Sequence, residues 1–214
     1  MKVLVVGANG QIGKQLVDLL NESTEHEARA MLRKAEQTAE FEDKGVETVI
    51  ASLEGTVEDI ASAAKGCDAI VFAAGSGGHT GLDKTLLVDL DGAVKTIEAA
   101  EQAGIDRFIM VSALQANNRE NWAEVIKPYY VAKHYADRAL LQSGLNYTII
   151  RPGGLLNEPG TGKIEIAENI KTGSIPRIDV AKTIFACLNE KNTFKKAFDL
   201  ISGDINIAEA IKRI

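Results

Sequence analysis

The sequence predicts an α/β fold, a doubly wound parallel sheet with helices on both faces. Short apolar, β-branched runs alternate with segments of helical periodicity along the chain, which is typical of repeated strand and helix units. The first run passes through a glycine-rich turn directly into a helical pattern. The chain has 214 residues, 45% of them hydrophobic, and no repeat or linker, so we expect one domain over residues 1–214.

Seven strands are expected from the apolar runs, and the intervening segments are long enough for crossover helices. The strands are expected at residues 2–6, Ala28–Leu32, Thr48–Ala51, Ala69–Ala73, Arg107–Val111, Tyr147–Arg151 and Ala197–Ile201. Val57–Lys65 and Val88–Ala103 have the length and period of crossover helices, so the connections should be right-handed and the strands parallel. The ligand cleft then lies at the carboxyl ends of the strands.

One long irregular stretch interrupts this alternation. It runs from Gly153 to Arg177 and has three prolines in or beside it. Long irregular segments inside a compact fold are commonly functional. We expect residues 153–177 to form a small substrate lobe within the single domain.

The turn after the first strand reads Gly7-Ala8-Asn9-Gly10-Gln11-Ile12-Gly13 and matches the pattern GxxGxxG. Gly7 permits the tight turn, Gly10 lets the backbone approach a pyrophosphate, and Gly13 lets the helix lie close on the strand. The free N–H groups of the first helical turn would face the phosphates. A P-loop is excluded because Gln15 stands where that motif needs Ser or Thr. This predicts a Rossmann-type dinucleotide site, the alternative being a turn whose glycines serve conformation alone.

The end of the second strand indicates which dinucleotide binds. An NAD site usually places Asp or Glu there to accept a hydrogen bond from the ribose 2′-OH, whereas this chain has Arg33 and Lys34. The Arg33 guanidinium could stack on adenine and form a forked contact with a 2′-phosphate. The sequence therefore favours NADP over NAD, unless these two residues are simply a solvated basic pair.

Composition limits the partners and the location. A net charge of −6 and a pI near 5.2, with no basic stripe, argue against a nucleic-acid or membrane-surface binder. Cys67 and Cys187 lack redox or metal spacing, so we expect core thiols and no metal. No signal peptide precedes the first strand, and no apolar segment approaches the ~20 residues that span a bilayer. A cytoplasmic location is expected.

A tyrosine and a lysine four residues apart form the candidate catalytic pair. Tyr129 and Lys133 follow Pro128, which suits a first helical turn, so the two side chains share one helix face. A lysine ammonium beside the phenol would lower the phenol pKa and make it a proton donor or acceptor near neutral pH. Ser112, at the end of the strand Arg107–Val111, could orient a carbonyl oxygen. The alternative is that Tyr129 only caps a buried helix face.

Seven segments together carry a family resemblance. They are residues 7–13, Arg33, Ala73-Ala74-Gly75, Asp89-Leu90-Asp91-Gly92, Val111-Ser112-Ala113, Tyr129-Tyr130-Val131-Ala132-Lys133 and Arg151-Pro152-Gly153-Gly154. With them the chain resembles, over nearly its whole length, the atypical NmrA-like and biliverdin-reductase-B-like branch of the short-chain dehydrogenase/reductase superfamily, which includes NAD-dependent epimerases and dehydratases.

The resemblance implies roles for particular residues. Ser112, Tyr129 and Lys133 match the catalytic positions, and Lys133 would also hold the nicotinamide ribose. Asp89 stands where standard members carry a proton-relay asparagine, a departure that bears on turnover. The implied cofactor contacts beyond the glycine turn and Arg33 are Leu53 on the adenine side, Ala73, Ala74 and Gly75 along the adenosine and pyrophosphate, and Pro152, Gly153, Gly154 and Leu155 near the nicotinamide and substrate.

These observations support two classes of function. The first is an NADP-dependent oxidoreductase that transfers hydride to a small carbonyl, quinone or flavin-like acceptor, or an epimerase with the same chemistry. The second is a non-catalytic NADP-binding sensor with a regulatory protein partner. A homo-oligomer is compatible with both. Trp122 could stack on a planar substrate or pack in the core, and His79, in a glycine-rich loop, is assigned no catalytic role.

Overall fold

The computed structural model describes residues 1–78 and 80–214, so His79 lies outside the described residues. The strands are β1 (Lys2–Val6), β2 (Glu27–Leu32), β3 (Glu47–Ile50), β4 (Ala69–Phe72), β5 (Arg107–Val111), β6 (Asn146–Pro152), β7 (Gly154–Leu156), β8 (Lys163–Ala167), β9 (Ser174–Pro176), β10 (Lys196–Ser202) and β11 (Ile205–Asn206). The α-helices are α1 (Gln11–Asn21), α2 (Ala39–Glu42), α3 (Val57–Ala64), α4 (Leu82–Lys84), α5 (Gly92–Ala103), α6 (Lys127–Gln142), α7 (Arg177–Cys187) and α8 (Ile207–Lys212). Short 3₁₀ turns are η1 (Ala35–Gln37), η3 (Arg119–Asn121), η4 (Glu124–Ile126) and η5 (Lys191–Thr193), and η2 (Thr85–Asp91) is π-helical.

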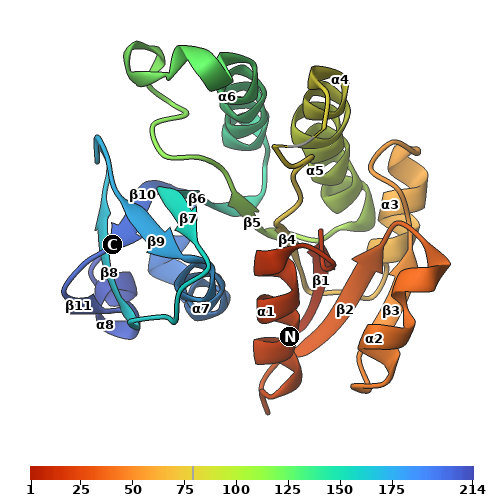
Figure 1. The fold of residues 1–214 in the computed structure, drawn as a ribbon. Coiled ribbons are helices and arrows are strands. Elements are labelled where there is room, and N and C mark those ends of the chain that lie inside the picture. Colours follow the sequence, from red (N-terminus) through yellow and green to blue (C-terminus); the bar gives the residue numbers. More distant parts are fainter. Residues whose placement is uncertain (79) are drawn as a thin grey trace.

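The main sheet has nine strands in the order β11-β8-β10-β6-β5-β4-β1-β2-β3 (Figure 1). The seven strands from β10 to β3 are parallel, while β8 and β11 are antiparallel additions at one edge. All seven expected strands are present, and the predicted doubly wound α/β fold is confirmed. The chain leaves β1 toward β2 and β3 and then crosses to β4, so the order reverses between β1 and β4. Ligands of open α/β sheets bind at such a reversal.

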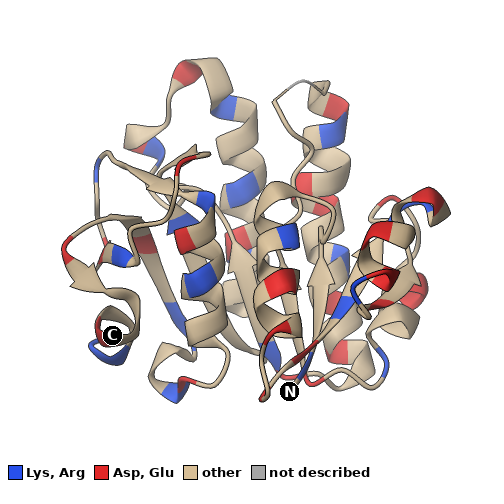
Figure 2. Ribbon diagram, turned by 60° about the horizontal axis from the view of Figure 1, so that its bottom comes forward, with Lys and Arg blue, Asp and Glu red and all other residues tan. Residues whose placement is uncertain are grey.

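Helices cover both faces of the sheet, because the apolar residues of each buried strand alternate between the two sides. Val3 and Val5 of β1 pack with one core cluster, which includes α1, α7 and α8. Leu4 and Val6 pack with the opposite cluster, which includes α3, α5 and α6. Acidic and basic residues are interspersed along the ribbon (Figure 2). None of the helices in the described residues is long and apolar enough to cross a membrane.

The helix expected over Val88–Ala103 begins earlier than predicted. Helical structure starts at Leu82 in α4, continues through the π-helical η2, and ends with α5 at Ala103. A π-helical segment is rare and often marks a functional site. Here it carries Asp89, whose carboxylate is buried and accepts a hydrogen bond from the Ser76 backbone N–H at 3.0 Å. The wide turn therefore joins the helix to the loop that follows β4.

The segment 153–177 contains three short strands. β8 adds to the main sheet beside β10, whereas β7 and β9 pair with each other in a separate two-stranded parallel sheet. Two side chains of α7 hold this segment. Asp179 accepts hydrogen bonds from the backbone N–H groups of Thr161 and Gly162, and Arg177 donates to the Leu155 carbonyl.

Candidate active site

The glycine turn between β1 and α1 is closely packed against the chain that follows β4. Gly7 has a φ of +87°, and a Cβ placed there would lie 2.6 Å from the Ala74 backbone nitrogen. A Cβ on Gly13 would lie 2.2 Å from the Gly7 carbonyl oxygen. Both positions therefore require glycine. Gly7 needs it for its positive φ and its contact with Ala74, and Gly13 needs it for the close packing of α1 on the turn.

The first turn of α1 is free to bind an anion. Its N-cap is Gly10, which provides no side-chain hydrogen bond, and no acidic residue follows in the first turn. The backbone N–H groups at this end and the positive end of the helix dipole both favour a phosphate. A dinucleotide diphosphate fits this position.

A cavity of about 450 Å³ lies beside this turn at the carboxyl ends of β1 to β4. Seven predicted cofactor residues line it: Gly7, Asn9, Gly10, Arg33, Leu53, Ala74 and Gly75. Other predicted cofactor residues do not line it: Gln11, Ile12, Gly13, Ala73, Lys133, Pro152, Gly153, Gly154 and Leu155. The cavity thus lies beside the glycine turn and the ends of β2 and β3, and the predicted residues after β5 and β6 lie outside it.

Sequence reasoning missed several cavity residues, among them Gln37, Ser52, Glu54 and Lys84. The Gln37 side-chain oxygen accepts hydrogen bonds from the Arg33 and Lys34 backbone N–H groups at 3.1 and 3.0 Å, which shapes the end of β2. Glu54 forms an ion pair with Lys84 at 2.7 Å across the rim. Ser52 and Glu54 flank the predicted Leu53, so their position after β3 was an available signal.

The end of β2 presents a basic group. Arg33 is exposed at the cavity, and none of the ion pairs within residues 1–78 and 80–214 includes it. Its guanidinium is available to an anionic ligand. The only carboxylate lining the described part of the cavity belongs to Glu54, whose charge is balanced by Lys84.

Ser112 and Lys133 are held at the carboxyl end of β5. The Ser112 backbone N–H donates to the Ile150 carbonyl at 2.7 Å, while its Oγ is buried and has no partner among the described residues. Lys133 is also buried, and its Nζ donates to the Val111 carbonyl at 2.7 Å. Because Val111 precedes Ser112, α6 is tied to the strand beside the unpartnered hydroxyl. Buried polar groups are normally bonded, so this hydroxyl is a candidate ligand contact.

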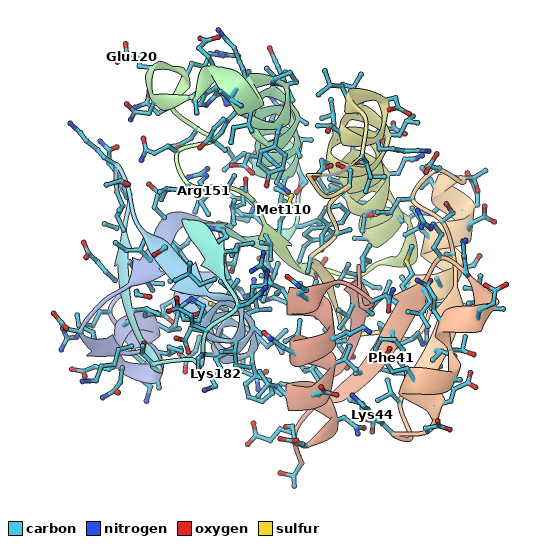
Figure 3. The ribbon with its side chains drawn as sticks, viewed as in Figure 1. Phe41, Lys44, Met110, Glu120, Arg151 and Lys182 are labelled. Carbon is cyan, nitrogen blue, oxygen red and sulfur yellow. The ribbon has the colours of Figure 1, made fainter. Side chains whose placement is uncertain are left out.

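Two buried carboxylates act on Lys133. Burial lowers the Lys133 pKa, and the negative charges of Asp89 and Asp137 act in the opposite direction without fully compensating. Asp137 itself is paired with Arg151 of β6 at 2.8 Å, and both side chains are buried. Arg151 is labelled below α6 in Figure 3. The lysine therefore lies in a buried polar cluster contributed by η2, α6 and β6.

The Tyr129 pKa is shifted in the opposite direction to that expected from Lys133. Burial raises the pKa of this phenol, and the negative charge of Asp89 raises it further. The expectation of a lowered pKa neglected both effects, since neither is visible in the four-residue spacing. A phenol with a raised pKa stays protonated near neutral pH, so it cannot act as a base there, and it is a weaker acid than the sequence suggested.

The predicted nicotinamide-side residues have clear structural contacts. The Pro152 carbonyl accepts from the Leu114 N–H at 2.9 Å, and the Gly153 N–H donates to the Leu200 carbonyl at 2.9 Å. A Cβ on Gly153 would lie 2.4 Å from the Gly173 carbonyl oxygen, so packing alone requires glycine there. Gly154 is exposed and Leu155 half-buried beside it.

Within the described residues, no cluster of three His, Cys, Asp or Glu side chains could hold a metal.

Comparisons with known proteins identify the family of this chain. A family model described as NAD(P)H-binding matches residues 7–191. A Bacillus subtilis protein named "uncharacterized sugar epimerase YhfK" is 65% identical over all of both chains. The solved structure of the oxidoreductase ylbE from Lactococcus lactis is 36% identical, with a TM-score of 0.92, over 100% of this chain and 96% of that one.

A more distant solved structure is ChuY from Escherichia coli O157:H7, described as an anaerobillin reductase. It is 25% identical, with a TM-score of 0.83, over 96% of this chain and 99% of that one. The family model covers the glycine turn, the cavity residues from Gly7 onward and the segment that contains Ser112, Tyr129 and Lys133. This chain belongs to the NAD(P)H-binding family of Rossmann-fold proteins, in its atypical short-chain dehydrogenase/reductase-like branch.

Proposed function

We propose that the protein is an NADPH-dependent reductase of a small carbonyl, quinone or flavin-like acceptor. The observation that carries this proposal is the buried Ser112 Oγ without a described partner, at the strand end where Lys133 is tied to Val111. A hydroxyl kept dry and unbonded is suited to donate a hydrogen bond to an acceptor oxygen. Tyr129, which stays protonated near neutral pH, is the side chain proposed to supply the proton.

NADPH, when bound, supplies the hydride. The first turn of α1 would hold the diphosphate, and Arg33 would contact the 2′-phosphate. Lys133 would bind the nicotinamide ribose, and Ser112 would orient the acceptor oxygen. The names of two relatives, a sugar epimerase and an anaerobillin reductase, are both compatible with hydride transfer by this arrangement. The reductase is preferred because only residues 153–176 lie between β6 and α7, leaving little chain to enclose a bulky sugar nucleotide.

The function is tested by following NADPH oxidation with FMN, menadione and a small aldehyde as separate acceptors. We expect NADPH to bind and at least one acceptor to be reduced with saturation kinetics. Tight NADPH binding without turnover of any acceptor would favour the NADP-binding sensor. The absence of NADPH binding would contradict both functions.

Replacing Arg33 by Ala should weaken the binding of NADPH more than the binding of NADH. Loss of a charged contact with the 2′-phosphate costs about 1.5–3 kcal/mol, or roughly ten- to hundredfold in NADPH affinity. NADH has no such phosphate, so its Kd should stay within about twofold. The measurement is a titration of each cofactor by fluorescence or calorimetry.

Lys34→Ala is the matched control for Arg33→Ala. Lys34 has the same charge and is the next residue, but it does not line the cavity. Its replacement should change NADPH affinity much less. Equal losses of affinity for NADPH and for NADH in Arg33→Ala would contradict a 2′-phosphate contact.

Replacing Asp89 by Asn should move the alkaline limb of kcat/KM to lower pH. The Asp89 charge raises the Lys133 pKa, and burial lowers it. Without that charge Lys133 loses its proton at a lower pH, and a neutral lysine binds and orients the cofactor less well. The amide can still accept the Ser76 hydrogen bond. The control is Asp91→Asn, because Asp91 is an exposed carboxylate of the same π-helical segment, paired with Lys95.

An alkaline limb of kcat/KM at the same pH in Asp89→Asn and in the wild type would show that Asp89 does not act on Lys133.

A further inference from the structure

Gln115 is held in an uncommon backbone conformation three residues after Ser112. Its φ is +61°, which non-glycine residues adopt infrequently, and the residue is buried. Such a conformation persists only where the surroundings determine it, and it is enriched at functional sites. Its contacts therefore indicate what the conformation serves.

The Gln115 side chain bonds to nearby Asn121 and to two segments that are distant in sequence. Its Nε2 donates to Asp199 Oδ2 of β10 at 2.7 Å and to Asn169 Oδ1 at 3.1 Å. Its Oε1 accepts from Asn121 Nδ2 at 2.7 Å. Asp199 is fully buried and also accepts from the Ile170 backbone N–H at 3.0 Å. Gln115 thus anchors the chain between Ser112 and Tyr129 to the main sheet.

An aromatic stack continues from this anchor to the proposed proton donor. The Trp122 indole N–H donates to the Gln115 carbonyl at 3.2 Å. The Trp122 ring stacks on Tyr130, with centroids 5.9 Å apart and planes 6° apart. Tyr130 in turn contacts Tyr129, with centroids 6.2 Å apart. The three rings therefore form a series of contacts that runs from the Gln115 carbonyl to Tyr129.

We propose that Gln115 is a positioning residue, which sets the orientation of the Tyr129 phenol through Trp122 and Tyr130. The proposal rests on the proposed reductase function and deepens it. Gln115 touches neither cofactor nor acceptor in this role. It lowers the barrier by holding the proton donor in a narrow range of orientations, and a displacement of about 1 Å in such a group can cost roughly a hundredfold in rate.

The test is Gln115→Gly, which removes the side chain while glycine still adopts a positive φ without strain. The matched control is Lys195→Gly. Lys195 is the other non-glycine residue with a positive φ among the described residues, at +57°, and it is exposed and remote from this network. Trp122 is the single tryptophan of the chain, so its fluorescence reports on the stack directly.

In Gln115→Gly we expect kcat to fall by about ten- to hundredfold. The Kd of NADPH should stay within about twofold, because Gln115 does not line the cofactor cavity. The Trp122 emission should shift to longer wavelength, because the backbone carbonyl that accepts from the indole loses its side-chain anchor and the indole becomes more hydrated. Lys195→Gly should match the wild type in all three measurements. Assays are run well below the melting temperature of each variant, which excludes unfolding as the cause.

A second pair of variants tests the side-chain contact itself. Gln115→Glu places a carboxylate against Asp199 and should lower kcat as much as Gln115→Gly does. Adding Asp199→Asn restores a donor and acceptor pair between the two side chains, so the double variant should recover part of the lost kcat. Asp199→Asn alone should not exceed the wild type.

If the wild type is active, three outcomes would overturn the proposal. Unchanged kcat with a shifted emission would show that Gln115 holds Trp122 but not the proton donor. Unchanged emission would show that Gln115 does not hold Trp122. A loss of NADPH affinity equal to the loss of kcat would indicate general distortion of the fold. A wild type that binds NADPH but reduces no acceptor would contradict the reductase function. Gln115 would then have no catalytic positioning role, even if the Trp122 emission shifts in Gln115→Gly.

Discussion

Replacing Tyr129 by Phe is expected to lower kcat of NADPH-dependent reduction by about 10²–10⁴-fold, the usual contribution of a positioned general acid. The variant loses only the phenolic oxygen, so the aromatic contact with Tyr130 remains. The Kd of NADPH should change by less than about threefold, because the phenol donates its proton to the acceptor and not to the cofactor. The measurement is steady-state oxidation of NADPH together with a binding titration. Since burial and Asp89 raise the Tyr129 pKa, the wild type should show no loss of activity from phenol ionisation near neutral pH.

Tyr130→Phe is the control for this change. Tyr130 is the next residue and is half-buried in the same aromatic stack, but it stands outside the predicted pair. Its replacement should leave kcat within about threefold. Full activity in Tyr129→Phe would mean that solvent or another group protonates the acceptor. Hydride transfer would then still hold, but the role of Tyr129 as the acid would be contradicted.

Replacing Gly13 by Ala is expected to destabilise the fold by about 3 kcal/mol or more. The added Cβ would lie 2.2 Å from the Gly7 carbonyl oxygen and 2.9 Å from the Ala8 Cα, both backbone atoms that cannot rotate away. α1 would have to move off β1, which would also displace the N–H groups proposed to bind the diphosphate. Urea unfolding should show a lower midpoint, and NADPH affinity should fall with it.

Gly144→Ala separates this clash from the general effect of replacing glycine. Nothing lies within 4 Å of a Cβ built at Gly144, and its φ is outside the positive range. The variant should be neutral or more stable by up to about 1 kcal/mol, because alanine restricts the unfolded chain. Equal destabilisation by the two variants would show that Gly13 is not required for helix packing.

The sheet was predictable to the extent that its strands are determined locally. The apolar runs of β1, β4 and β5 are buried on both faces, so a continuous apolar pattern identifies them. β7, β8, β9 and β11 lie in or after the stretch that the sequence suggested was irregular. They are short, and their stability depends on pairing with β10 or with each other. Their sequences alone carry too little signal to locate them.

Local sequence also predicts some features of the candidate site and not others. The glycine turn, the basic residue after β2 and the spacing of Tyr129 and Lys133 follow from local geometry and could be read directly. The π-helical segment that buries Asp89 could not be, because its wide turn depends on contacts with the loop after β4. The roles of Gln37 and Gln115 were also invisible, since both are amides whose partners are known only after folding.

The sequence by itself determined the α/β fold, the parallel direction of its main strands and the position of the glycine turn, because short-range sterics and apolar periodicity decide these. Only the tertiary structure decided the direction of the Tyr129 pKa shift, the burial of Lys133 and the contact of Gln115 with Asp199. Gln115 and Asp199 are 84 positions apart. Desolvation and long-range hydrogen bonding depend on which groups the fold brings together, and no local pattern specifies that.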